Sequence, residues 1–291
     1  MFAEFLQFLF SGFTVGAIYA LVGLGFTIIY NASHVINFAQ GEFVMLGGMS
    51  TVFLISTGMP MPVAMLGAVI ITILIGLALQ KFALQPARNA SIVTLIIITI
   101  GASIFLRGAA QVLLGRNFRS LAPISGNDPI MIGGAAVLPQ SLWIMGGTMA
   151  IVIALQFFFN RTLIGKAIVA SAHNPVAARL AGINASFTML LSFGLAAMLG
   201  GIAGILIAPI SLSYPGVGIM LGLKGFCAAV LGGLGNPMGA VVGGLIVGIS
   251  EAMTAGYISS AYKDAVAFVI ILAVLFFLPS GLFGRRGTER V

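Results

Sequence analysis

Residues 5–41 read FLQFLFSGFTVGAIYALVGLGFTIIYNASHVINFAQG and contain no Asp, Glu, Lys or Arg. A helix needs about 20 apolar residues, at ~1.5 Å each, to cross the ~30 Å hydrocarbon core of a bilayer. The stretch is long enough for one crossing, and a second uncharged run follows it over 43–80. Since the start is not basic and the apolar part is too long for a signal peptide, we interpret it as a membrane anchor.

The rest of the chain follows the same pattern. Of its 291 residues, 60% are hydrophobic and 7% are charged, whereas soluble domains carry roughly 25% charged residues. Lipid must therefore face most of the surface, and continuous apolar runs favour helices over barrel strands. The sequence predicts an all-α polytopic membrane protein, with one transmembrane domain over 1–291. About eight transmembrane helices are expected, at 7–29, 35–57, 62–80, 91–113, 141–159, 187–208, 226–250 and 264–280.

The net charge of +7 reflects the orientation of the chain in the membrane and does not indicate nucleic-acid binding, because most basic residues lie in short loops beside apolar runs. Three segments hold most of this charge: 80–90, 160–186 and the tail with Arg285, Arg286 and Arg290. The positive-inside rule places all three in the cytoplasm and the N-terminus outside. Eight crossings would put the tail outside, so one crossing must be false or missing.

The false or missing crossing is expected in the segment near 223–253. This segment contains LGGLGNPMGAVVGG at 231–244, and glycine and proline break or kink helices. We predict a discontinuous or re-entrant segment here, with one intact helix that uses glycine for close packing as the alternative. The stretches GEFVMLGG (41–48) and GFCAAVLGG (225–233) are weakly similar, as internal repeats of transporters are.

No catalytic or metal motif is present. A Walker A sequence needs Ser or Thr after its lysine, but Lys166 is followed by Ala167. The chain has no HExxH sequence and a single cysteine, Cys227, which excludes a Cys-based zinc site. We therefore expect no ATPase site, no enzyme activity and no cofactor, and an intramembrane enzyme is not supported.

Glu42 is the charge that lies most clearly inside an apolar run. Burying an ionised group in lipid costs at least ~2.5–3.5 kcal/mol, so Glu42 should face a cavity or a partner. Six residues form the candidate translocation path, three around this charge and three in the glycine-rich segment: Asn37, Gln40, Glu42, Gly232, Gly233 and Asn236. The alternative for Glu42 is a structural hydrogen bond between helices.

Arg107 is the partner of Glu42 that charge suggests, but the expected depths differ by ~13 Å at ~1.5 Å per residue. A direct pair is not expected unless 37–41 is unwound, and Arg107 is expected to extend its side chain to the membrane surface. Four further charges near expected span ends should anchor the chain at the interface: Lys224, Glu251, Lys263 and Asp264.

The loop 161–186, RTLIGKAIVASAHNPVAARLAGINAS, predicts a short capped helix. Asn174 is a good N-cap, Pro175 suits the first helical position and Gly182 is a good terminator. The helix 175–181 would be about 10 Å long, too short to span, and a second short helix over 165–172 can precede it. Such a cytoplasmic projection suits docking into a groove of a soluble partner; the alternative is an interfacial helix lying on the membrane.

Four stretches resemble a known family: GAIYALVGLGFTIIYNASHVINFAQGEFVMLGG (16–48), GKAIVASAHNPVAARLAGIN (165–184), KGFCAAVLGGLGNPMGAVVGG (224–244) and LPSGLFG (278–284). Over nearly its whole length the chain resembles permease subunits of branched-chain amino acid ABC transporters, and its opening is similar to the shorter, first permease of the pair. The resemblance implies a permease domain that moves leucine, isoleucine and valine across the bacterial inner membrane, with ATP hydrolysed by separate subunits.

The implied partners are a second permease subunit, two ATP-binding subunits, a periplasmic substrate-binding protein and the lipid bilayer, with no nucleic acid. Within the cytoplasmic coupling loop 161–186, the resemblance implies an ATPase-coupling surface of Gly165, Asn174, Ala177, Ala178 and Gly182. Permeases of the same family for urea, short amides or other amino acids remain alternatives, as does an ion-coupled secondary transporter that works alone.

Overall fold

The helices of the computed structural model, which describes residues 2–284, follow the uncharged runs of the sequence. In chain order they are α1 (Phe2–Ser33), α2 (Gln40–Ser56), α3 (Met61–Ala78) with its π-helical continuation (Leu79–Leu84), α4 (Ile92–Leu113), α5 (Pro139–Arg161), α6 (Leu163–His173), α7 (Pro175–Leu180), α8 (Ala185–Ile207), α9 (Val217–Gly232), α10 (Pro237–Tyr257), a 3₁₀ turn (Ser260–Tyr262) and α11 (Lys263–Phe277). The strands β1 (Ile130–Ile132) and β2 (Ala135–Val137) pair antiparallel.

The expected all-α polytopic fold is confirmed. Within residues 2–284, seven helices are long and apolar enough to cross a membrane. About eight spans were expected, and the difference of one arises at the second predicted span. The helix expected over 35–57 begins only at Gln40 and has 17 residues. His34 takes a positive φ of 54° just after α1, and the chain up to Gln40 turns without forming a helix.

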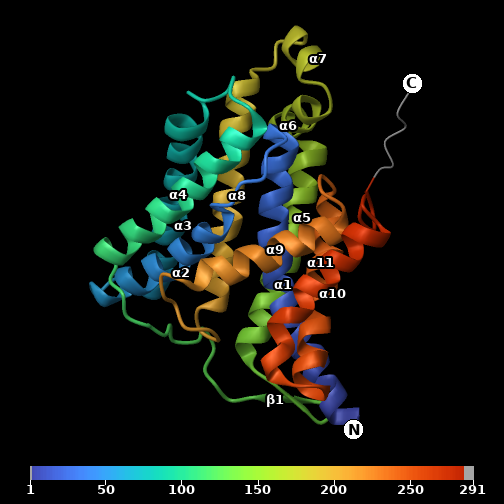
Figure 1. Cartoon of the computed structure of the whole chain (residues 1–291). Coiled ribbons are helices and arrows are strands. Elements are labelled where there is room, and N and C mark those ends of the chain that lie inside the picture. The colour runs from blue at the N-terminus through green and yellow to red at the C-terminus, as the bar shows by residue number, and fades with distance from the viewer. Residues whose placement is uncertain (1, 285–291) are drawn as a thin grey trace.

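The discontinuity expected near 223–253 is confirmed, and the single helix expected over 226–250 is wrong. Gly233 and Gly235, both at φ 96°, end the 16-residue helix α9 in the left-handed region that glycine tolerates best. Pro237 then begins α10 at the position where its missing N–H has no partner to lose. Two separate helices therefore take the place of the single expected one, and α11 then returns toward the end that carries α6 and α7 (Figure 1). The basic tail at 285–291 lies outside the described residues.

Helix α1 lies at the centre of the bundle and is almost wholly buried along its apolar length. The helices α8, α9 and α10 pack around it, while α3, α4 and α11 lie on the outside (Figure 1). These outer helices carry large exposed apolar side chains, for example Phe105 on α4 and Phe276 on α11. Lipid is the solvent that suits such a surface. The β1–β2 hairpin lies against the start of α1, where Gln7 binds both polar backbone groups of Ala136.

Glycine sets how closely the central helices approach. On α10, a Cβ at Gly248 would collide with backbone atoms of Gly16 and Gly12 on α1. On α8, a Cβ at Gly204 would collide with the carbonyl oxygen of Val44 on α2. Inside a bilayer, helices associate largely through such close packing of small residues. The short helices α2 and α9 also touch each other through Gly41 and Gly218.

Gly248→Ala is expected to destabilise the protein by about 1–3 kcal/mol, because the new methyl group meets backbone that cannot rotate away. The midpoint of thermal unfolding in detergent measures this effect. Gly101→Ala on α4 is the matched control, since a Cβ there has open space around it. The control should be neutral or gain up to ~1 kcal/mol from helix propensity. Equal midpoints for the two variants would contradict the packing argument.

Candidate functional site

The predicted helix after Asn174 forms as α7, at the end of the bundle opposite the N-terminus (Figure 1). The Asn174 Oδ1 accepts hydrogen bonds from the N–H groups of Val176 and Ala177, at 3.1 and 3.0 Å. Gly182, at φ 83°, ends the turn, and the N–H of Ile183 bonds back to the carbonyl of Ala178. The caps that the sequence predicts therefore form as expected. The second expected short helix forms as α6.

Of the five residues that the family resemblance implies, Asn174, Ala177 and Gly182 are exposed, whereas Gly165 and Ala178 are buried. Ala178 is 4% exposed, and a Cβ at Gly165 would collide with the carbonyl of Phe158. These two residues can therefore serve a coupling surface by packing beneath it. Val176 and Leu180, four positions apart on one face of α7, are 68% and 86% exposed. An exposed apolar pair on a short, capped helix is typical of a docking site. The sequence had pointed to the alanines of this helix and not to Val176 and Leu180.

At the centre of the bundle, Glu42 is 1% exposed and its Oε1 accepts two hydrogen bonds. The Ser103 hydroxyl donates at 2.8 Å and the Arg107 Nη2 donates at 2.6 Å. The other carboxylate oxygen, Oε2, is buried and has no hydrogen-bond partner. The three side chains line a cavity of about 190 Å³ whose remaining walls are apolar apart from two glycines.

The expected absence of a Glu42–Arg107 pair was wrong. The depth estimate assumed that the second span began at 35, but the chain turns from 34 to 39 and α2 begins only at Gln40. Glu42 therefore lies in the first turn of a helix that starts inside the bundle. The Arg107 side chain is 26% exposed and turns inward to Glu42 instead of extending to the membrane surface. The sequence had allowed a direct Glu42–Arg107 pair only if 37–41 were unwound, and the chain is indeed not helical before Gln40.

Asn37 and Gln40, the other two path candidates near Glu42, are also fully enclosed. Gln40 donates from Nε2 to the carbonyl of Ala196 on α8, at 3.0 Å, and leaves its Oε1 without a partner. Asn37 accepts from the N–H of Ala39 and leaves its Nδ2 without a partner. Buried polar groups are nearly always paired. Asn37, Gln40 and Glu42 are exceptions, because each keeps one buried polar atom without a hydrogen-bond partner.

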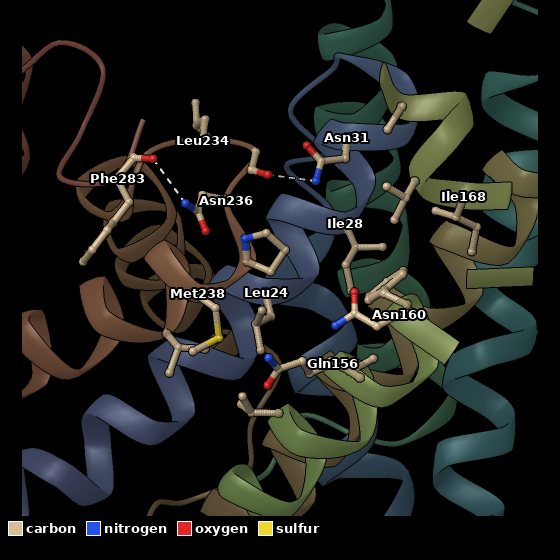
Figure 2. A pocket seen from close by; sticks show the side chains of 18 of the residues that line it. Leu24, Ile28, Asn31, Gln156, Asn160, Ile168, Leu234, Asn236, Met238 and Phe283 are labelled. Atoms are coloured by element: carbon tan, nitrogen blue, oxygen red, sulfur yellow. Dashed lines mark hydrogen bonds between the residues drawn. The ribbon is translucent and has the colours of Figure 1, made fainter. Parts of the chain in front are cut away.

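A larger cavity, of about 610 Å³, lies on another face of α1. Leu24 and Ile28 of α1 form one wall, and Gln156 and Asn160 of α5 face them (Figure 2). Helix α6 closes one side with four residues that include His173. The lining combines apolar groups with uncharged amides, and it adjoins the α6–α7 projection.

Of the three path candidates in the helix break, Asn236 lines this larger cavity. Its Oδ1 accepts from the N–H of Gly239 and its Nδ2 donates to the carbonyl of Phe283, each at 3.1 Å (Figure 2). Gly232 packs against Gly239, and Gly233 packs against residues 280–284. Of the six predicted path residues, Glu42 lines the smaller cavity and Asn236 lines the larger one, and both cavities have side chains of α1 in their walls.

A second buried ion cluster was not expected. The Lys224 Nζ lies 2.7 Å from Glu251 Oε1 and 2.6 Å from Asp264 Oδ1. The Tyr19 hydroxyl donates to Glu251 Oε2 at 2.7 Å. The expectation that Lys224 and Glu251 anchor the chain at the interface was wrong, since their exposures are 4% and 8%. Because α9 starts at Val217 instead of 226, Lys224 lies in the middle of a helix.

The seven long apolar helices within residues 2–284 define a multi-pass membrane protein. The sequence matches the family described as branched-chain amino acid transport system / permease component over residues 8–275. The chain belongs to this family, as its sequence motifs had indicated.

Curated relatives agree with that assignment. The permease protein LivH of the high-affinity branched-chain amino acid transport system of Salmonella typhimurium is 34% identical, over 100% of this chain and 99% of its own length. BraD of Pseudomonas aeruginosa is 32% identical, over 99% and 98%. The similarity to both is consistent with the expected shorter, first permease. The ribose import permease RbsC of Escherichia coli is 28% identical, over 88% and 81%.

A solved structure supports the fold alone. PsaBC from Streptococcus pneumoniae in complex with Fab superposes with a TM-score of 0.51 at 14% identity, and the match covers 96% of this chain and 97% of that one. The arrangement of helices is thus shared with a protein of very different sequence.

Proposed function

We propose that this chain is one of two permease subunits of an ATP-driven importer for leucine, isoleucine and valine. Two separate subunits would hydrolyse ATP, a second permease would complete the membrane path, and a periplasmic binding protein would deliver the substrate. The bacterial inner membrane would hold the assembly. The substrate class is that of the relatives LivH and BraD. The coupling loop 161–186 would lie in the cytoplasm.

The α6–α7 projection is the observation that supports this proposal most strongly. It exposes Val176 and Leu180 within the basic segment 160–186, at the end of the bundle where the basic segment 80–90 also lies. A lone secondary transporter would have no need of a capped helix that presents apolar side chains to a partner. A separate motor would use the helix to move α8, which follows α7 in the chain and contacts both α6 and α7.

Coupling requires a preference, because ATP can shift the permease between two forms only when its binding favours one of them. In the proposed cycle, closure of the two ATP-binding subunits moves the docked α7 helices. The permease pair then alternates between outward-open and inward-open forms. Substrate choice would rest mainly on the binding protein, and this subunit would supply part of the path.

Reconstitution of the whole importer in liposomes tests the proposal. With ATP inside and the binding protein outside, labelled leucine, isoleucine and valine should accumulate, whereas urea and acetamide should not. Uptake by the permease alone under a proton or sodium gradient would reject an ATP-driven importer. ATP-driven uptake of urea or acetamide without leucine would keep the mechanism and overturn the substrate.

A further inference from the structure

The cavity beside Glu42 and Arg107 combines two features that a structural ion pair does not need. One carboxylate oxygen of Glu42 stays without a hydrogen bond, although the residue is 1% exposed. The buried Nε of Arg107 also lacks a partner. A buried polar atom without a partner costs about 1–3 kcal/mol. Both unpaired atoms belong to side chains that line the cavity.

The charge arrangement selects a narrow class of ligand. Glu42 and Arg107 together carry no net charge, so neither a lone cation nor a lone anion is favoured. A molecule that carries both charges close together can lie beside the pair, with its cation on Glu42 and its anion on Arg107. Charge-assisted hydrogen bonds of this kind are stronger than neutral ones, and the guanidinium group suits a carboxylate.

The walls add a second requirement. Phe26 of α1, Phe38 and Phe226 of α9 line the cavity together with aliphatic side chains of α4 and α9. At about 190 Å³, the space is smaller than the ~300–1,000 Å³ of pockets for drug-sized ligands. It therefore suits one small molecule with an apolar side chain.

We propose that this cavity is a transient binding site for an α-amino acid zwitterion with an aliphatic side chain. The ammonium group binds Glu42, the carboxylate binds Arg107 and the side chain lies among Phe26, Phe38 and Phe226. The inference rests on the proposed function and adds to it a location inside this subunit. The cavity opens between α4 and α9, where Ile104 is 63% exposed. Since a zwitterion cannot enter from lipid, the proposal requires that the second permease subunit of the proposed importer cover this face.

Neutralising the charges separates a binding site from a structural pair. In the reconstituted importer, Glu42→Gln and Arg107→Gln should each lower leucine uptake per ATP hydrolysed by ~10-fold or more, since each loses one charge-assisted contact. A purely structural pair predicts a different pattern, because the worst state is one unpaired buried charge. In that case Glu42→Gln/Arg107→Gln would recover uptake. For a zwitterion site the double variant stays as impaired as either single variant.

Arg116→Gln, an exposed arginine just beyond the end of α4, is the control and should transport normally. Two results would overturn the site and leave the proposed function standing, provided that the wild-type importer takes up leucine. Either both single variants and the double variant transport normally, or the double variant recovers the uptake that the single variants lose. If the wild-type importer accumulated no amino acid with ATP, the proposed function would fail first.

Photolabelling keeps the site testable if the variants do not fold. A leucine analogue with a diazirine in its side chain is illuminated in the wild-type importer during turnover, and labelled peptides are identified by mass spectrometry. Label on α4 or on the part of α9 that contains Phe226 is expected, and excess leucine should remove it. Label confined to the binding protein or to the larger cavity would overturn the assignment.

Discussion

Val176→Glu/Leu180→Glu is expected to abolish ATP-driven uptake while the chain still inserts into the membrane. The two side chains are 68% and 86% exposed on one face of α7, so the substitutions disturb no internal packing. Burying one such side chain in a partner groove contributes about 1.5–3 kcal/mol, and a charge in its place must also lose its hydration. Losing both contacts should weaken binding of the ATP-binding subunits by ~100-fold or more.

Co-purification of the ATP-binding subunits with the permease measures this loss directly, and uptake in liposomes measures its consequence. Ile130→Glu/Met131→Glu is a matched control, because these two apolar side chains of β1 are exposed at the opposite end of the bundle. The control should retain the ATP-binding subunits. Retention of these subunits and of uptake by the α7 variant would contradict docking at this helix. Ala178 is a poorer target, since at 4% exposure it reports on packing.

The features of the site that the sequence predicts are those that depend on neighbouring residues alone. Asn174 and Gly182 cap α7 through bonds that span only a few positions. The break after Gly232 follows from Gly233, Gly235 and Pro237, which lie within one short stretch of the chain. Helix existence, helix ends and turns were therefore predictable at these places. The uncharged runs likewise predicted the polytopic class.

The features that the sequence could not predict depend on where helices start and how they cross. Counting residues from an assumed span end placed Glu42 and Arg107 at different depths, yet they lie 2.6 Å apart. The same method placed Lys224 at an interface, although α9 crosses the bundle obliquely and buries it (Figure 1). One signal was available, since Lys224 follows LGL and precedes GFCAAVLGG, so apolar residues flank it on both sides.

Lys224→Met is expected to lower stability by about 3–5 kcal/mol, because it leaves the carboxylate of Glu251 buried without its cation. Glu251 would keep only the hydrogen bond from Tyr19. Asp264 should contribute little to the loss, since its side chain is 46% exposed and can be hydrated. The thermal unfolding midpoint of the purified importer in detergent measures the effect.

Removing the charge of Glu251 as well shows whether the loss of stability comes from its unpaired carboxylate or from the lost contacts of Lys224. Lys224→Met/Glu251→Gln should recover most of the stability, because the amide oxygen of glutamine still accepts from Tyr19 and no buried charge remains. Lys263→Met is the control for loss of a lysine, since Lys263 is exposed beside Asp264, and it should change stability by less than ~0.5 kcal/mol. If the double variant were no more stable than Lys224→Met, the ionised state of Glu251 would not be the cause. The cluster would then stabilise the bundle through the packing of Lys224 against Tyr19. The Lys224 Nζ lies 5.5 Å from the centroid of the Tyr19 ring.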